Sequence, residues 1–185
     1  MNASVYIATS LDGFIAREDG ALDWLPTPEA GGEDYGYHGF FASVDAVVIG
    51  RHTYEAVRGF GGWAYGKTPV VVLTHRPLEI PAPMRETVEA MSGSPAEVVQ
   101  RLAERGMQHV YVDGGKTIRG FLAAGLIRRL ILTRVPVLIG RGIPLFGPLP
   151  HDVRLRHVET RSYPDGLVQS EYEVAPAAPT IRETR

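Results

Sequence analysis

Two adjacent glycines followed by lysine and threonine stand at residues 114–117, within the stretch VYVDGGKTIRGFLAAGLI that runs from Val110 to Ile127. Such residues could cradle a phosphate, because glycine allows close backbone approach and the first N–H groups of a helix attract anions. The phosphate loop of ATPases needs a glycine five residues before the Gly-Lys pair, and Val110 occupies that position. What remains is an anion site or a plain tight turn between a strand and a helix, formed by Asp113, Gly114, Gly115, Lys116, Thr117 and Ile118.

Two further segments place cationic and hydroxyl side chains directly after an apolar run. Ile49 is followed by Gly50, Arg51, His52 and Thr53, and Leu73 is followed by Thr74, His75 and Arg76. An arginine beside free N–H groups makes a good anion site, although a capped helix with a solvated arginine would read the same way. The carboxyl ends of parallel strands share one edge of a sheet, so three such junctions suit a ligand with several phosphates.

Other chemistries find no support in the sequence. The chain has no cysteine, which excludes disulfides, thiolate zinc sites and a cysteine nucleophile. The six histidines show no i, i+4 pairing with acids in the order of metal ligands, so no metal site is expected. The Gly-x-Ser-x-Gly elbow of serine hydrolases and the Gly-x-Gly-x-x-Gly fingerprint of dinucleotide-binding folds are both missing.

The charge of the chain is nearly balanced, with 19 Lys and Arg against 21 Asp and Glu. No overall field therefore favours a nucleic acid or a membrane surface as partner, and a small-molecule ligand is expected. No apolar stretch approaches the length of a membrane span and no leader is recognised, so a cytoplasmic location is expected by elimination.

Short apolar or β-branched runs alternate with helical patterns, which predicts an α/β domain with a mostly parallel sheet and helices on both faces. The predicted strands are residues 4–8, 46–49, 69–74, 109–112, 130–135, 154–160 and 167–174, and the last two flank the turn Tyr163-Pro-Asp-Gly166 as an antiparallel edge hairpin. Helices are predicted over 35–43 and 53–57, from Ser94 to Gly106, and from Lys116 to near Gly125. Residues 26–36 and 76–93 are expected to be surface loops.

The expected organisation is one domain over residues 1–175, followed by a poorly ordered tail over residues 176–185 with the sequence PAAPTIRETR.

The order of these segments resembles the dihydrofolate reductase fold family, and within it the reductase domain of the bifunctional riboflavin-biosynthesis deaminase-reductase. The resemblance covers roughly residues 3 to 174. It rests on YIATSLDGFIAREDGALDWL, VVIGRHTYEAV, VVVLTHR, the Gly-Gly turn, and LILTRVPVLIGRGIPLF.

This resemblance implies an NADPH-dependent reductase and a homodimer. Ala8 and Ile15 would meet the nicotinamide amide, and Trp24 would lie beside it or anchor a loop. Gly50, Arg51 and Thr53 would face phosphates, and Thr74, His75 and Arg76 would select the 2'-phosphate. The residues Asp113 to Ile118 would belong to the diphosphate turn.

For catalysis, the resemblance implies an acid and a threonine that hold the substrate ring. Thr133 matches the threonine; Asp34 is the nearest acid, although Tyr37 aligns equally well. An acidic residue at Asp113, like Asp12 in its turn, is typical of the riboflavin branch. The predicted reaction is therefore hydride transfer to a pyrimidine ribosylamine phosphate or a related heterocycle. A dihydrofolate or other pterin reductase and a noncatalytic nucleotide-binding protein are the alternatives.

Overall fold

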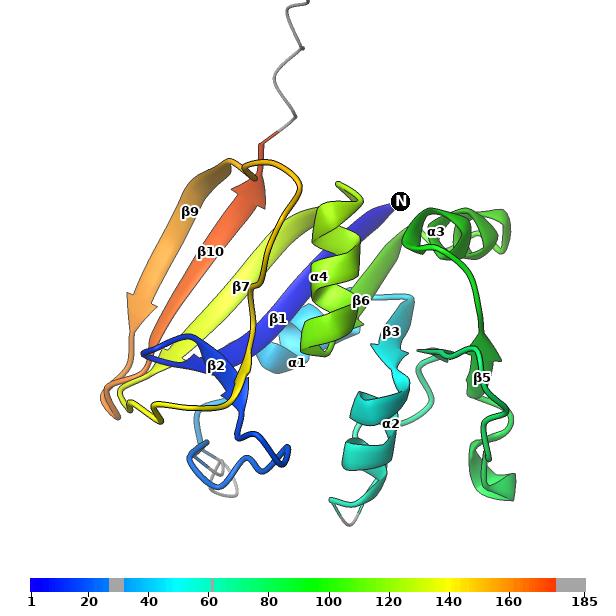
Figure 1. Cartoon of the computed structure of the whole chain (residues 1–185), viewed down its shortest axis with the longest axis horizontal. Coiled ribbons are helices and arrows are strands. Elements are labelled where there is room, and N and C mark those ends of the chain that lie inside the picture. Colours follow the sequence, from blue (N-terminus) through cyan, green and yellow to red (C-terminus); the bar gives the residue numbers. More distant parts are fainter. Residues whose placement is uncertain (27–31, 61, 176–185) are drawn as a thin grey trace, which may run out of the picture.

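The computed structural model describes residues 1–26, 32–60 and 62–175. Its centre is one eight-stranded sheet in the order β5-β4-β3-β6-β1-β7-β10-β9 (Figure 1). A second sheet pairs β2 with β8. The strands are β1 Asn2–Ser10, β2 Phe14–Ala16, β3 Ala46–Gly50, β4 Val70–Leu73, β5 Val88–Met91, β6 His109–Asp113, β7 Ile127–Val135, β8 Ile143–Pro144, β9 Leu155–Ser162 and β10 Val168–Val174.

Six of the eight strands run parallel. Strand β1 pairs in parallel with β6 and β7, β3 with β6 and β4, and β4 with β5, whereas β10 is antiparallel to both β7 and β9. The predicted class, a mostly parallel sheet with a C-terminal antiparallel hairpin, is thus confirmed. The turn over 163–166 closes that hairpin, with a hydrogen bond from the Gly166 amide to the Tyr163 carbonyl of 2.9 Å.

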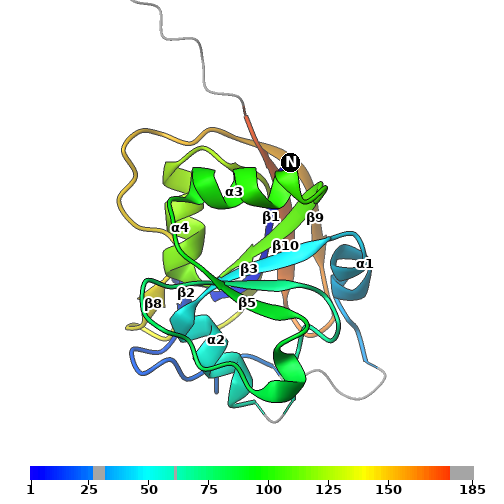
Figure 2. The same cartoon turned by 90° about the vertical axis from the view of Figure 1, so that its right-hand side faces the viewer.

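The helices are α1 Tyr37–Ala42, α2 Arg51–Arg58, α3 Pro95–Glu104 and α4 Gly115–Ala123, with a 3-10 turn at Ala82–Met84. They cover both faces of the sheet, as predicted (Figure 2). The alternation of strand side chains decides which face each residue serves. In β3, Val48 joins the core beneath α3 and α4, while Val47 and Ile49 join the core beneath α1 and α2.

Helix α3 begins where the capping pattern predicts. The Ser94 hydroxyl accepts a hydrogen bond from the Glu97 amide at 3.3 Å, and the Glu97 carboxylate accepts one from the Ser94 amide at 2.7 Å. Val98 and Leu102 are fully buried, which contributes roughly 1.5–3 kcal/mol for each side chain. The chain leaves the helix at Gly106, where φ is +85°.

The sequence patterns did not indicate three short strands, β2, β5 and β8. Strand β5 lies inside residues 76–93, and the prediction of a continuous surface loop there was wrong. Its four residues pair with β4 and bury Val88 and Met91, so a tertiary contact overrides the loop-like composition. Strands β2 and β8 are only three and two residues long.

The structure does not test every segment predicted from the sequence. The predicted tail over 176–185 and part of the predicted loop over 26–36 fall outside the described residues, and the single domain over 1–175 stays a prediction. No helix in the described part of the chain is long and apolar enough to cross a membrane.

Candidate active site

The three predicted junctions meet at the carboxyl edge of the parallel sheet. Gly50 at the end of β3 pairs with Leu73 of β4, and Ile49 pairs with Asp113 of β6. The segments that follow these strands therefore lie next to one another. This is the edge at which open α/β sheets bind their ligands.

The Gly-Gly turn packs closely against neighbouring segments. Gly114 has φ +88°, and a Cβ there would lie 2.2 Å from the Thr53 hydroxyl oxygen on α2. A Cβ at Gly115 would lie 2.8 Å from Ile15, and one at Gly50 would lie 3.0 Å from the Thr117 hydroxyl. The glycines thus let three separate segments approach within contact distance.

Two helices begin at this edge without a side-chain cap. Helix α2 starts after Gly50 and α4 after Gly114, and neither residue offers a side-chain hydrogen bond to the first turn. The first N–H groups of both helices therefore remain available to a ligand. Adjacent helix N-termini with free N–H groups favour anions.

Arg51 holds the neighbouring junction in place. Its guanidinium donates to the Thr74 hydroxyl at 3.2 Å, to the Arg76 carbonyl at 3.0 Å and to the Pro77 carbonyl. Thr74 also accepts a hydrogen bond from the Arg76 amide at 3.1 Å. Within the described residues the Arg76 guanidinium has no hydrogen-bond partner, so it is the cation at this junction that can turn to a ligand.

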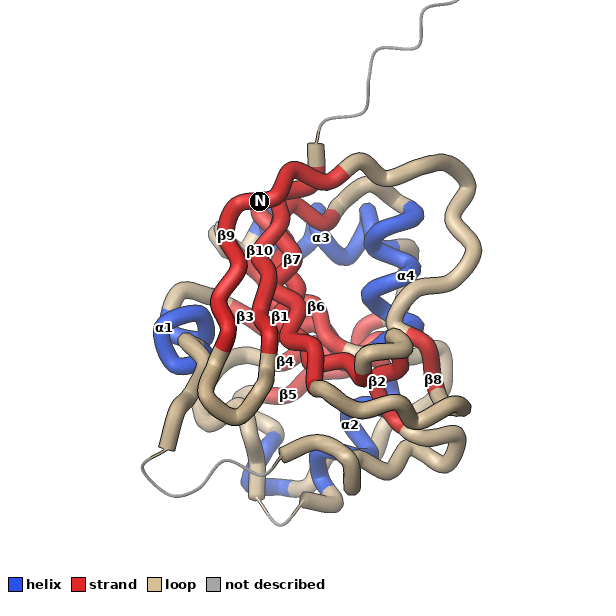
Figure 3. Tube along the Cα trace, turned by 90° about the vertical axis from the view of Figure 1, so that its left-hand side faces the viewer, coloured by secondary structure: helices blue, strands red, loops and turns tan. Residues whose placement is uncertain are grey.

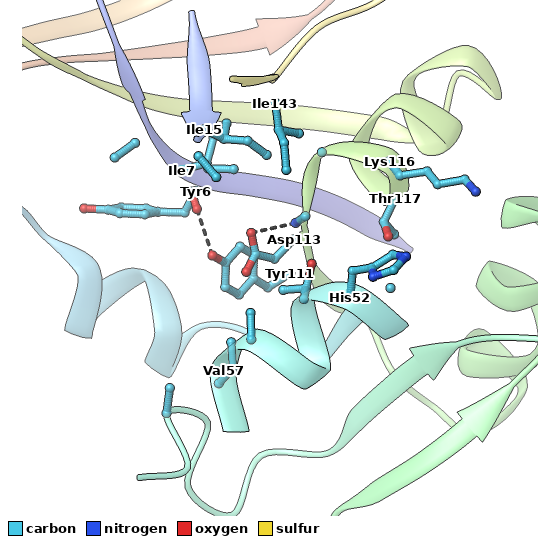
Figure 4. Close-up of a pocket in the computed structure, with 18 of the residues that line it drawn as sticks. Tyr6, Ile7, Ile15, His52, Val57, Tyr111, Asp113, Lys116, Thr117 and Ile143 are labelled. Atoms are coloured by element: carbon cyan, nitrogen blue, oxygen red, sulfur yellow. Dashed lines mark hydrogen bonds between the residues drawn. The ribbon is translucent and has the colours of Figure 1, made fainter. Parts of the chain in front are cut away.

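A cavity of about 1210 Å³ opens over these junctions (Figure 4). It brings together nearly all the residues predicted from the sequence to bind the cofactor or substrate. Those that line it are Ala8, Ile15, Asp34, Gly50, Arg51, Thr53, Thr74, His75, Arg76, Asp113, Gly114, Gly115, Lys116, Thr117 and Thr133.

Two predicted contacts are not in the lining. Ile118 is fully buried in the core, and its amide bonds to the Gly114 carbonyl at 2.9 Å, so neither part of it faces the cavity. Trp24 also lies outside the lining, which agrees with its alternative role as a loop anchor. Asp12 likewise caps turns, accepting hydrogen bonds from the amides of Gly140 at 2.7 Å and Ile139 at 3.3 Å.

Thr133 and Asp34, the predicted catalytic pair, have different partners. The Thr133 hydroxyl accepts from the Gln169 amide at 3.0 Å, and the same amide donates to the Tyr6 hydroxyl at 2.9 Å. Asp34 instead caps α1, accepting from the amides of Gly36 at 2.9 Å and His38 at 3.0 Å. These hydrogen bonds lower the pKa of Asp34 to about 2. A carboxyl group held ionised in this way is a poor proton donor.

Asp113 differs from Asp34 because its environment raises the pKa of the carboxyl group. Burial raises the pKa of its carboxyl group, although the Gly114 amide at 2.7 Å and the Tyr65 hydroxyl at 3.3 Å both donate to it. Burial also raises the pKa of Tyr37 to about 12 and that of Tyr111 well above its usual range. These tyrosines line the cavity around Asp113, and sequence patterns did not single out Tyr65 or Tyr111.

The expectation about histidine pairing was wrong at one position. The His38 imidazole lies 2.6 Å from the Asp34 carboxylate, an i, i+4 pair at the start of α1. The described part of the chain nevertheless contains no group of three or more His, Asp or Glu that could hold a metal ion.

The model of the RibD C-terminal domain family matches residues 4–169. The chain belongs to this family. Among curated proteins, the uncharacterized Bacillus subtilis protein YwjB is 35% identical to this RibD-family chain over 161 residues, 86% of this chain and 90% of that protein. The Haloferax volcanii dihydrofolate reductase HdrB is 33% identical over 127 residues, 66% of this chain and 62% of that protein.

Solved structures share the fold. A crystal structure from Shewanella sp. PV-4 that carries a provisional riboflavin biosynthesis name is 36% identical and superimposes with a TM-score of 0.89, over 95% of this RibD-family chain and all of that one. The Enterococcus faecalis dihydrofolate reductase bound to NADP(H) is 16% identical with a TM-score of 0.65, over 95% and 97% of the two chains. The predicted dihydrofolate reductase-like fold is confirmed, and the family supports a pyrimidine reductase-type function.

Proposed function

We propose that this RibD-family chain is an NADPH-dependent reductase that transfers hydride to a pyrimidine or a related heterocycle. The observation that supports it most is the adjacency of two uncapped helix N-termini, of α2 and α4, over one cavity. A dinucleotide carries two bridging phosphates, and this edge of the sheet offers it free N–H groups. The NADP(H) bound to the E. faecalis relative is consistent with the same ligand here.

The proposed cofactor contacts follow from the geometry of the junctions. The turn from Gly114 to Thr117 and the start of α2 at Thr53 would hold the diphosphate through backbone N–H groups and hydroxyls. Arg76, with Thr74 and His75 beside it, would hold the 2'-phosphate. Arg51 would act mainly by fixing that junction, because its guanidinium already binds the Arg76 and Pro77 carbonyls.

When bound, NADPH would supply the hydride; the chain would orient the reactants and exclude water. Ala8 and Ile15 both line the cavity, and Ile15 lies beside Gly115. Asp113 also lines the cavity, and its raised pKa makes it a better candidate than Asp34 for holding a proton near the substrate. Thr133 stays in the proposal as a wall of the substrate site.

A pterin is the second candidate substrate, because HdrB is a dihydrofolate reductase that is 33% identical to this chain. A noncatalytic nucleotide-binding role would retain the phosphate contacts and show no NADPH oxidation with either ring. We also propose that the chain forms a homodimer and is located in the cytoplasm.

Replacing Arg76 with alanine tests the cofactor assignment. The change should raise the dissociation constant of NADPH by about tenfold or more and change that of NADH by no more than about twofold, since only NADPH carries the 2'-phosphate. Titration calorimetry measures both dissociation constants. Equal losses for the two cofactors would remove Arg76 from the site.

A further inference from the structure

We propose that the substrate of this chain is a planar heterocycle that carries no phosphate or carboxylate tail. This inference rests on the proposed function and narrows it, because it sets aside the ribosylamine phosphate expected from the resemblance. It follows from the contrast between the two ends of the cavity. We call one end the phosphate lobe; it is formed by residues 50–53, 73–76 and 114–120. We call the other end the ring lobe; it is formed by Tyr6, Glu33, Asp34, Tyr37, Phe60, Tyr65 and Asp113.

In Figure 4, His52, Lys116 and Thr117 lie on one side of Asp113 and Tyr111, and Tyr6 lies on the other. The nicotinamide end of a dinucleotide held by the phosphate lobe would reach the boundary between the two lobes. The ring lobe is therefore the space left for the molecule that accepts the hydride.

Aromatic side chains form much of the ring lobe. Tyr6 and Tyr37 pack edge to face with ring centroids 5.3 Å apart, and Tyr37 lies near Tyr65 and Tyr111. Phe60 also lines the cavity and is 62% exposed. Aromatic walls of this kind favour a flat ring, which can stack on them or meet their edges.

The acidic side chains of the cavity lining all lie in the ring lobe. Glu33, Asp34 and Asp113 line it. Every lysine or arginine in the described lining, namely Arg51, Arg76, Lys116 and Arg119, belongs to the phosphate lobe. The sequence is consistent with this division, because residues 18–45, which form the connection from β2 to β3 apart from Arg17, contain no lysine or arginine.

Three basic side chains close to the ring lobe, those of His38, Arg58 and Arg161, have partners. The His38 imidazole is paired with Asp34 at 2.6 Å. The Arg58 guanidinium sits over the Tyr54 ring, 5.4 Å from its centroid, and Arg161 forms an ion pair with Glu159 at 2.8 Å.

A phosphate or carboxylate tail in this lobe would gain no ion pair from a lysine or arginine of the lining and would face the carboxylates of Glu33 and Asp34. Like charges at short range repel one another, which disfavours binding of an anionic tail. A neutral ring, or one bearing amino groups that donate to the carboxylates, meets no such penalty. The lobe therefore selects by charge as well as by shape.

The test uses two pairs of ligands, each with a planar ring and each differing in an anionic group, added to protein saturated with NADP⁺ so that no hydride is transferred during the titration. One pair is 6-methylpterin and 6-carboxypterin; the other is the ribosylaminopyrimidine and its 5'-phosphate. Calorimetry should give a dissociation constant at least about fivefold lower for the uncharged member of a pair that binds. The difference should shrink between about 0.02 M and about 0.5 M salt, because salt screens the repulsion.

Glu33→Gln supplies the variant, since the amide oxygen can still accept the hydrogen bond from the Tyr35 amide at 3.0 Å. It should improve binding of the anionic members by about twofold at low salt. Glu86→Gln, the same change of charge outside the cavity lining, should have no effect.

Tighter or equal binding of the anionic members would overturn the inference, and so would failure of both uncharged ligands to bind. Either result with NADPH binding intact leaves the proposed reductase standing. Absence of NADPH binding would overturn the proposed function and the inference together.

Discussion

Gly114 and Thr53 approach so closely that a single added carbon at Gly114 would lie 2.2 Å from the Thr53 hydroxyl oxygen. The two residues come from different junctions, one after β6 and one at the start of α2. Their contact fixes the relative position of the two helix N-termini that face the cavity. The proposed diphosphate site depends on that position.

Gly114→Ala should therefore lose both stability and cofactor binding. A side chain at φ +88° is strained by roughly 1–3 kcal/mol, and the contact with Thr53 adds an overpacking cost. Urea unfolding measures the total loss of unfolding free energy. Gly106→Ala is the matched control, because Gly106 has φ +85° with nothing within 4 Å of an added Cβ. Equal losses in the two variants would show that Thr53 does not constrain the turn.

Asp113→Asn should make stability less sensitive to pH. Burial raises the pKa of Asp113 above its ordinary value of 3.8, so the folded state retains the proton longer than the unfolded state. Wild-type stability from this group is then complete below the ordinary pKa and is lost as pH rises through the folded pKa. As pH rises from the ordinary pKa through the folded pKa, the unfolding free energy of the variant should increase relative to that of the wild type. A difference in unfolding free energy that is independent of pH would contradict the burial of a raised-pKa carboxyl.

Asp34→Asn separates helix capping from catalysis. The hydrogen bonds that Asp34 accepts lower its pKa from 3.8 to about 2, so its contribution to stability is present above pH 3.8 and disappears as pH falls toward 2. The variant should be less stable than the wild type near neutral pH, and the two should converge in acid. NADPH oxidation should change by no more than about twofold. A large loss of kcat with unchanged stability would instead make Asp34 catalytic.

Strand β9 is the surface that the proposed homodimer would use. It forms the outer edge of the sheet (Figure 3), and all eight of its residues are exposed, including Leu155 at 41% and Val158 at 43%. Unpaired edges readily pair with another chain. Val158→Lys should raise the dimer dissociation constant by about tenfold or more in sedimentation experiments. Leu138→Lys, at a position 69% exposed elsewhere, should not; a monomeric wild type would end the dimer proposal.

The three junctions could be predicted from the sequence because their signals are local. After β3 and β6, an apolar strand, one or two glycines and the start of a helix occupy consecutive residues, as at Ile49 to Thr53; after β4, hydroxyl and basic side chains follow the strand directly. The parallel pairing then brings the junctions together without further information. The capping box at Ser94 and the turn at Tyr163 are local in the same way, and the structure confirms both.

Other features depend on contacts between distant residues. Ile118 follows the Gly-Gly turn in sequence, but the helix rotates its side chain into the core. The tyrosines around Asp113 come from α1, β6 and the segment after α2, so no sequence pattern joins them. Strand β5 is held by its pairing with β4, not by its own composition.

Titration of the purified chain with NADPH tests the central claim most directly. Calorimetry should show one site per chain and a preference for NADPH over NADH of about tenfold or more. At about one hundred times its dissociation constant, NADPH should add about 2.7 kcal/mol to the free energy of unfolding. No binding heat and no stabilisation, or equal affinity for the two cofactors, would contradict the account.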